Sequence, residues 1–160
     1  SGRITNALTS LGKKMKQDIR EDLKEALLQK DELKKGTLRM LLAALVNKEK
    51  EKNLGPLTEE QIQNVILSEV KKRKEATEAF KKGGRPEMAE KERKEMEILQ
   101  KYLPEQIPEE EIRKLVKEAI EQTGAATSQE MGKVMAALMP KIKGKADGAF
   151  VSALVKELLQ

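Results

Sequence analysis

The chain has almost no aromatic residues, and this scarcity limits the folds that it can adopt. Only three of its 160 residues are aromatic: Phe80, Tyr102 and Phe150. The core must therefore be built from Leu, Ile, Val, Met and Ala, which suit packed helices better than sheets. The charged fraction is 37%, against a usual value of ~25%, so the core is thin for the length of the chain. We predict an all-α protein.

Apolar residues recur at helical spacing in the first part of the chain. This spacing predicts an amphipathic helix over residues 15–30. A second helix is expected to begin where Thr37 can cap it, directly after Gly36. The Asn-Leu-Gly-Pro stretch at 53–56 is expected to end that helix.

Two longer helices are predicted to follow. Thr58 and Gln61 have capping-box spacing, which indicates the start of a third helix. The Gly-Gly pair at 83–84 ends it, and Pro86 occupies the first turn of a fourth helix that continues until Pro104.

The C-terminal part contains three shorter apolar stripes. The first is expected to end at Gly124, the second to be capped by Ser128 and to end at Pro140, and the third to be capped by Asp147. Three stripes at this spacing predict a small three-helix bundle. Pro104 and Pro108 favour extended backbone just before it and indicate a domain boundary.

We therefore expect an N-terminal domain of about four helices over residues 15–103 and a three-helix domain over residues 109–160. Residues 1–14 carry three cations and no acid, and they begin with Ser-Gly rather than Met. We interpret them as a leader that is either native or a remnant of cloning. Without its three charges the net charge falls from +5 to +2, so the overall basicity says little about partners.

Several classes of chemistry have no residues to support them. The chain has no Cys and no His, which removes thiolate chemistry, disulfides and the commonest metal ligand. It has no Walker loop and no Gly-Xaa-Gly-Xaa-Xaa-Gly motif, so we expect no resident cofactor or metal. No stretch approaches the ~18 apolar residues of a membrane span, and no secretion segment is present. We expect a cytoplasmic protein without a membrane partner.

The segment 131–148 has an unusual charge pattern. Within the C-terminal part, residues 105–121 hold six Glu against three Lys or Arg. From Glu130 to Asp147, by contrast, no acidic residue intervenes, and four lysines do: Lys133, Lys141, Lys143 and Lys145.

This pattern has the components of a phosphate-binding loop. Such a loop needs cations, backbone that a phosphate can approach, and a helix N-terminus. The lysines supply the first, Gly144 and Gly148 permit the second, and the last helix begins after Asp147. In an extended loop, alternation places Lys141, Lys143 and Lys145 on one side. The alternative is an ordinary solvated loop with a glycine cap.

Other charged or sulfur-containing patterns are interpreted structurally. The cationic run 71–74 is interpreted as a solvated helix face, with an RNA-contacting face as the alternative. Met131, Met135 and Met139 lie four apart and are expected to fill the core, although such stripes can also bind partners. The carboxylate clusters 59–60 and 109–111 sit in predicted first turns, so helix-dipole complementarity explains them and no catalytic residue is assigned.

Four segments together resemble the YqeY family. These are TLRMLLAAL (37–45), EVKKRKEATEAFKKGGRPEMAEKE (69–92), YLPEQIPEEEI (102–112) and GKVMAALMPKIKGKADGAFVSALVKELL (132–159). The C-terminal part of that family is similar to the tail domain of GatB, a subunit of the tRNA-dependent amidotransferase. The resemblance implies a helical domain followed by a three-helix tail module that contacts tRNA. It points to Lys133, Lys141, Lys143, Lys145 and the backbone at Gly144 and Gly148 as the contact surface.

The resemblance also brings a nominal carbon-nitrogen ligase activity with glutamine as the amide donor. The chain contains neither an ATP loop nor a glutaminase nucleophile, so we expect a non-catalytic module. The leading hypothesis is binding of tRNA or another structured RNA. The alternatives are an accessory or component of the amidotransferase, acting with aminoacyl-tRNA, and a protein-protein adaptor.

Overall fold

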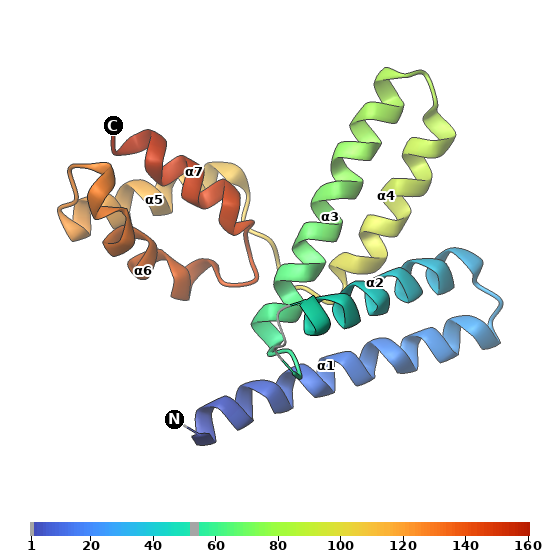
Figure 1. Ribbon diagram of the computed structural model, residues 1–160. Coiled ribbons are helices and arrows are strands. Elements are labelled where there is room, and N and C mark those ends of the chain that lie inside the picture. Colours follow the sequence, from blue (N-terminus) through green and yellow to red (C-terminus); the bar gives the residue numbers. More distant parts are fainter. Residues whose placement is uncertain (1, 52–54) are drawn as a thin grey trace. The chain divides into compact units, whose positions relative to one another are not determined.

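The computed structural model describes residues 2–51 and 55–160, which form seven α-helices, one 3-10 turn and no β-strand (Figure 1). The all-α prediction is confirmed. The helices separate into two compact units, one ending at Leu103 and the other beginning at Pro104. Independent folding of two domains stays a prediction. Within the described ranges, no helix combines the length and the apolar character that a membrane crossing requires.

Helices α1 (Gly2–Leu28) and α2 (Glu32–Glu51) form the first hairpin of the N-terminal unit (Figure 1). The first helix is longer than predicted, because residues 2–14 continue it towards the N-terminus. Gly12 is buried there, and a Cβ atom on it would lie 2.1 Å from the carbonyl oxygen of Leu57. Much of the expected leader is thus helical, and it is packed against the chain at Gly12.

The predicted start of α2 at Thr37 is wrong, since Thr37 lies inside the helix. Asp31 precedes the helix, and its carboxylate accepts a hydrogen bond from the Lys34 amide at 3.1 Å. Thr37 instead donates its hydroxyl to the Leu33 carbonyl at 2.8 Å, which satisfies a polar group within the helix. An interior glycine such as Gly36 costs only about 1 kcal/mol, too little to end a helix that buries an apolar face. Of the predicted stop at 53–56, residues 53 and 54 lie outside the described residues.

Helices α3 (Glu59–Lys82) and α4 (Pro86–Gln100) form the second hairpin. The capping box is confirmed: Thr58 accepts from the Gln61 amide, and the Gln61 side chain accepts from the Thr58 amide. Gly83 at the end of α3 and Pro86 at the start of α4 are also confirmed.

Helix α4 ends at Gln100, earlier than the predicted Pro104. Residues 101–103 form a turn that directs Tyr102 to α1, where its hydroxyl donates a hydrogen bond to Asp22. Burial and then this hydrogen bond raise the pKa of the Tyr102 phenol well above its usual range.

The core of the N-terminal unit is aliphatic, as the scarcity of aromatic residues requires. Helices α1, α2 and α3, the 57–58 segment and the end of α4 all contribute to it. Its buried members are Ile19, Leu38, Leu41, Leu45, Leu57, Ile62, Ile66 and Leu99.

A buried arginine joins three helices of this unit away from the aliphatic core. Arg73 of α3 is only 5% exposed. Its guanidinium lies 2.9 Å from the Glu69 carboxylate and 3.0 Å from the Glu95 carboxylate of α4. It also donates to the Glu69 carbonyl, and its remaining nitrogen lies 3.9 Å from the sulfur of Met40 on α2. These contacts supply partners for a charge that would otherwise be costly to bury.

The C-terminal unit packs α5 (Glu109–Thr123), α6 (Met131–Ile142) and α7 (Gly148–Leu158) around one core. The predicted cap at Gly124 is confirmed, with a left-handed φ of 69°. Ser128 does not cap a helix by its side chain; it begins a 3-10 turn over Ser128–Glu130. Pro140 lies inside α6 and not at its end: its ring removes one amide hydrogen bond, but the helix continues to Ile142, which is buried in the core.

The methionine stripe on α6 faces the core only in part. Met131 and Met135 are half-buried against the core of this unit, in agreement with the prediction. Met139 is 37% exposed, one of the large apolar side chains that reach solvent.

The close approach at Gly12 predicts a stability difference between two helical glycines. Gly12→Ala places a Cβ against the Leu57 carbonyl and should lower the free energy of unfolding by roughly 1–3 kcal/mol. Gly36→Ala is the matched control, because nothing lies within 4 Å of its Cβ position. It should stabilise the chain by about 0.5–1 kcal/mol. Urea unfolding of both variants measures these changes, and a neutral or stabilising Gly12→Ala would contradict the packing.

The ion cluster predicts that two arginine substitutions differ strongly. Arg73→Met leaves Glu95 without its cation and Glu69 with only the exposed Lys72, and it should lower the free energy of unfolding by about 3–5 kcal/mol. Arg93→Met is the control, since Arg93 pairs with Glu90 and Glu97 on the exposed face of α4. It should leave the free energy of unfolding almost unchanged, because exposed ion pairs contribute little. If thermal or urea unfolding gives the same loss of stability for both variants, the buried cluster contributes no more than an exposed ion pair.

Candidate nucleic-acid interface

Three of the four lysines singled out in the sequence lie around the turn that joins α6 to α7, which we call the basic loop (residues 141–147). Lys141 is in the last turn of α6, Lys143 caps that helix, and Lys145 lies in the following turn. Gly144 between them has a positive φ of 71°. The loop is thus a tight turn and does not have the extended backbone that the alternation argument assumed. The chain still brings Lys141, Lys143 and Lys145 together within five residues.

Lys133 lies apart from the basic loop. It is exposed in the first turn of α6, eight residues before Lys141. At a rise of 1.5 Å per residue, the two backbone positions are about 12 Å apart along the helix. This distance exceeds the spacing of adjacent phosphates, so Lys133 would contact a different part of a nucleic acid.

The segment 104–107 fixes the backbone of the basic loop. The Gln106 side-chain amide donates to the Gly144 carbonyl at 2.8 Å and to the Pro104 carbonyl at 2.9 Å. The Ile107 amide donates to the Lys145 carbonyl at 2.9 Å. These bonds hold the turn in one conformation from outside the helices that it connects.

The glycines of the loop differ in what they can offer to a ligand. Gly144 is buried and its carbonyl is bound by Gln106, so its role in this structure is to form the turn. Gly148, the first residue of α7, is exposed, and a Cβ on it would contact nothing within 4 Å. The Asp147 carboxylate accepts from the Ala149 amide at 3.0 Å and caps α7, as predicted. An acidic cap at this position competes with an anion for the same helix end.

The lysine side chains of the basic loop and Lys133 are exposed to solvent and give this surface a positive charge. Lys133, Lys141, Lys143 and Lys145 are all exposed. Among the described residues, no carboxylate pairs with Lys133, Lys141 or Lys145 within 4.0 Å. Lys143 does have an interaction within the chain.

The second cationic run, residues 71–74, is mainly structural. Arg73 belongs to the buried ion cluster, and Lys72 lies 3.5 Å from Glu69. Lys74 is exposed, and Lys71 has an interaction within the chain. The run therefore offers less positive charge to a ligand than its sequence indicates.

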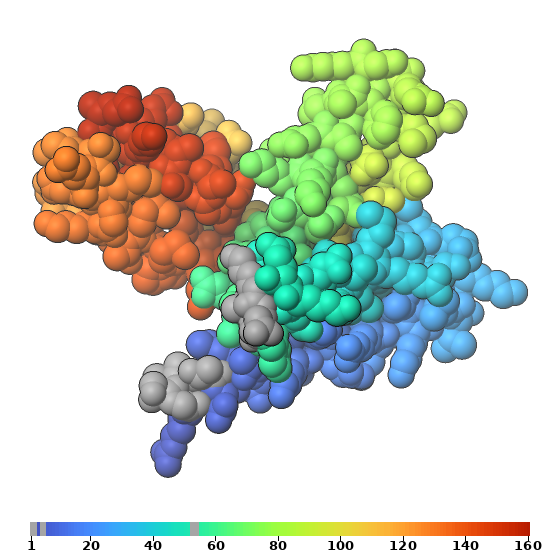
Figure 2. Space-filling view, in the orientation of Figure 1, coloured from blue at the N-terminus to red at the C-terminus, as the bar shows by residue number. Residues whose placement is uncertain are grey.

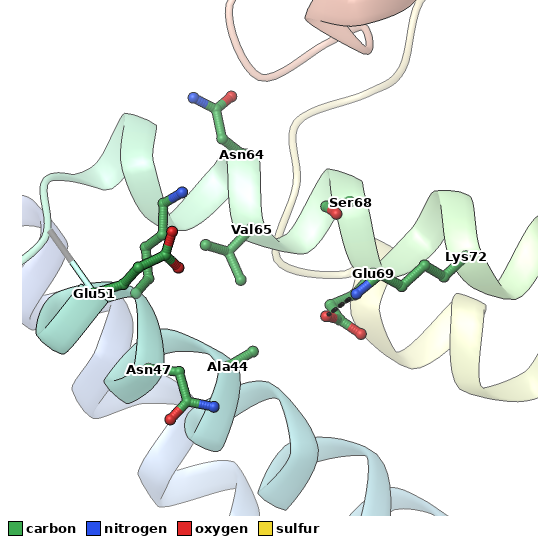
Figure 3. Close-up of a pocket in the computed structure, with 9 residues that line it drawn as sticks. Ala44, Asn47, Glu51, Asn64, Val65, Ser68, Glu69 and Lys72 are labelled. Atoms are coloured by element: carbon green, nitrogen blue, oxygen red, sulfur yellow. Dashed lines mark hydrogen bonds and ion pairs between the residues drawn. The ribbon is translucent and has the colours of Figure 1, made fainter.

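A groove between α2 and α3 was not anticipated from the sequence. It encloses about 420 Å³ and is lined by Asn47 and Ala44 of α2 and by Asn64, Ser68 and Glu69 of α3, among others (Figure 3). Small side chains such as Ala44 and Ser68 leave this space between the helices, and the spacing of apolar residues in the sequence does not reveal it. Its charges have both signs and include the Lys72–Glu69 pair. This lining indicates no particular reaction. Across residues 2–51 and 55–160, no group of three acidic side chains is arranged to hold a metal ion.

The comparison with protein families decides the affiliation of the chain. A family model described as Yqey-like protein matches residues 16–159. The chain belongs to the YqeY family. This confirms the resemblance that was recognised from four of its segments.

Curated relatives in fungi carry the name "Altered inheritance of mitochondria protein 41, mitochondrial". The protein of Eremothecium gossypii is 38% identical over 85 residues, which is 53% of this chain and 46% of that protein. The protein of Pyrenophora tritici-repentis is 30% identical over 145 residues, 88% of this chain and 78% of that protein. The Saccharomyces cerevisiae protein is 32% identical over 90 residues, 56% of this chain and 48% of that protein. The match thus spans about half the length of several relatives.

The expectation of a cytoplasmic protein is wrong by this comparison. The relatives are named as mitochondrial proteins. The expectation rested on the lack of cysteines and of a secretion segment, and neither feature distinguishes the cytoplasm from the interior of an organelle.

The bonds from the 104–107 segment predict a local effect on the basic loop. Gln106→Ala removes the donor to a buried carbonyl and should cost about 1–2 kcal/mol, with faster amide exchange in residues 143–147. Gln122→Ala, at an exposed position on α5, is the control. Hydrogen exchange followed by mass spectrometry measures both. Unchanged exchange in the loop of Gln106→Ala would show that the helices alone fix the turn.

Proposed function

We propose that this chain is a non-catalytic RNA-binding module whose C-terminal unit binds tRNA through the lysines of the basic loop and Lys133. The observation that carries the proposal is the exposed positive charge between Glu130 and Asp147, where no acidic residue intervenes. Lysines in such an arrangement attract phosphates and release the counterions condensed on a nucleic acid.

The contact is made by side chains more than by backbone. The Lys143 and Lys145 amides donate to the Met139 and Ile142 carbonyls, and Gly144 is buried. The amides of these two residues are therefore committed within the chain. The fixed turn instead holds the lysine stems at short spacing, which lowers the entropy lost when they engage adjacent phosphates.

The type of RNA is inferred from what the surface lacks and from the family resemblance. Stacking of single-stranded bases needs exposed aromatic side chains, and the chain has three aromatic residues in all. Phe150, the aromatic residue of the C-terminal unit, is half-buried against its core. Recognition of a folded RNA by shape fits this surface better. The resemblance to the GatB tail favours tRNA among folded RNAs.

The proposal predicts a specific salt dependence. Four lysines on four phosphates account for a log-log slope of about three to four against salt concentration. The variant K141A/K143A/K145A should lower the slope of tRNA binding by about two to three, as measured by filter retention across a salt series.

A matched control variant separates the effect of the basic loop from the effect of removing three positive charges. R113A/K114A/K117A removes the same charge from the same unit, at exposed positions on α5 next to glutamates, and should leave the slope close to that of the wild type. No binding of tRNA at low salt would refute the proposal. Equal slopes for the two triple variants would show that the basic loop is not the contact surface.

A further inference from the structure

The turn between α3 and α4 carries a second group of exposed cations. We call residues 79–86 the hairpin tip. No acidic residue lies between Glu78 and Glu87, and three cations do: Lys81, Lys82 and Arg85. Residues 81–88 are all exposed. Figure 2 shows this end of the hairpin projecting away from α1 and α2.

Neighbouring carboxylates bind these cations weakly. The Lys81 amine lies 3.8 Å from Glu78, and both side chains are about three-fifths exposed, at 61% and 62%. Exposed pairs of this kind contribute little and exchange readily for another anion. Among the described residues, no carboxylate lies within 4.0 Å of the Lys82 amine or the Arg85 guanidinium.

The backbone of the hairpin tip leaves room for a ligand between its cations. Gly84 has a positive φ of 71°, and a Cβ on it would meet nothing within 4 Å. Gly83 and Gly84 carry no side chains, so a phosphate can approach between Lys82 and Arg85 without steric hindrance. The Arg85 fork matches phosphate oxygens in two parallel hydrogen bonds.

We propose that the hairpin tip is a second RNA contact, in which Lys81, Lys82 and Arg85 bind the phosphate backbone independently of the basic loop. The identity of the ligand rests on the proposed function, while the site is a separate one. RNA therefore engages both units of the chain.

An RNA backbone fits the hairpin tip better than an acidic protein does. Stable protein interfaces have a desolvated core with aromatic or large apolar residues. The large apolar groups at the hairpin tip are the half-buried ring of Phe80 and the ring of Pro86, and Met88, 37% exposed, follows them. Three cations within five residues dominate this turn, and such a surface is suited to a ligand bound mainly through its charge.

The test uses the full chain and unfractionated tRNA in filter retention across a salt series. K81Q/K82Q/R85Q should lower the log-log slope by about two to three, because each cation accounts for about 0.7–0.9. The control R20Q/K24Q/R39Q removes three exposed cations from α1 and α2 of the same unit and should retain the wild-type slope. A hairpin-tip variant with the slope of the wild type or of the control overturns the inference.

A second measurement does not depend on substitution. Acetylation of the wild-type chain, read by mass spectrometry, should slow at Lys81 and Lys82 when tRNA is added and stay unchanged at Lys24. Equal acetylation with and without tRNA overturns the inference. Protection by poly-L-glutamate but not by tRNA also overturns it, in favour of an acidic protein partner.

The same experiments distinguish the two sites. If K141A/K143A/K145A keeps the wild-type slope while K81Q/K82Q/R85Q loses it, the basic-loop proposal fails and the hairpin tip stands. The reverse pattern retains the basic loop and overturns the hairpin tip.

Discussion

The buried guanidinium of Arg73 is the interaction on which the α3/α4 hairpin depends most. Beyond Ile66, the residues that α3 buries are Arg73 and Thr77, so the outer half of the hairpin has little aliphatic core. Ion pairs to Glu69 and Glu95 and the contact with Met40 replace that missing core. A chain that is 37% charged thus uses a charged residue where others use Leu or Phe.

The two basic turns share a physical design. Each joins two helices through a glycine with a φ of 71°, Gly84 in one unit and Gly144 in the other. Each lies in a stretch without acidic residues, whereas most other lysines of the chain have glutamates as near neighbours. They differ in backbone access, because Gly84 is exposed and Gly144 is buried. In both turns, however, the backbone amides are committed within the chain: those of Gly83, Gly84 and Arg85 donate to the Ala79, Lys81 and Phe80 carbonyls. Both turns therefore offer a phosphate their cationic side chains.

The sequence predicts the helices well where local chemistry determines them. The Thr58 capping box, Gly124 and Asp147 act within one helical turn, so their signals are complete in the sequence. The predicted helix start at Thr37 and helix end at Pro140 are wrong, because burial of the neighbouring Leu38 and Ile142 in the core outweighs the local boundary signal. The lysines of the basic loop are visible as a charge pattern. The role of Gln106 cannot be predicted from the sequence, because its partner Gly144 is 38 residues away and no sequence pattern connects the two.

The basic loop is held by a segment outside the two helices that it joins. Residues 104–107 are the first residues of the C-terminal unit. Hydrogen bonds from the Gln106 side chain and the Ile107 amide hold the basic loop. The position of Lys143 and Lys145 therefore depends on the segment that precedes α5 as well as on α6 and α7, although 38 residues separate the two in sequence.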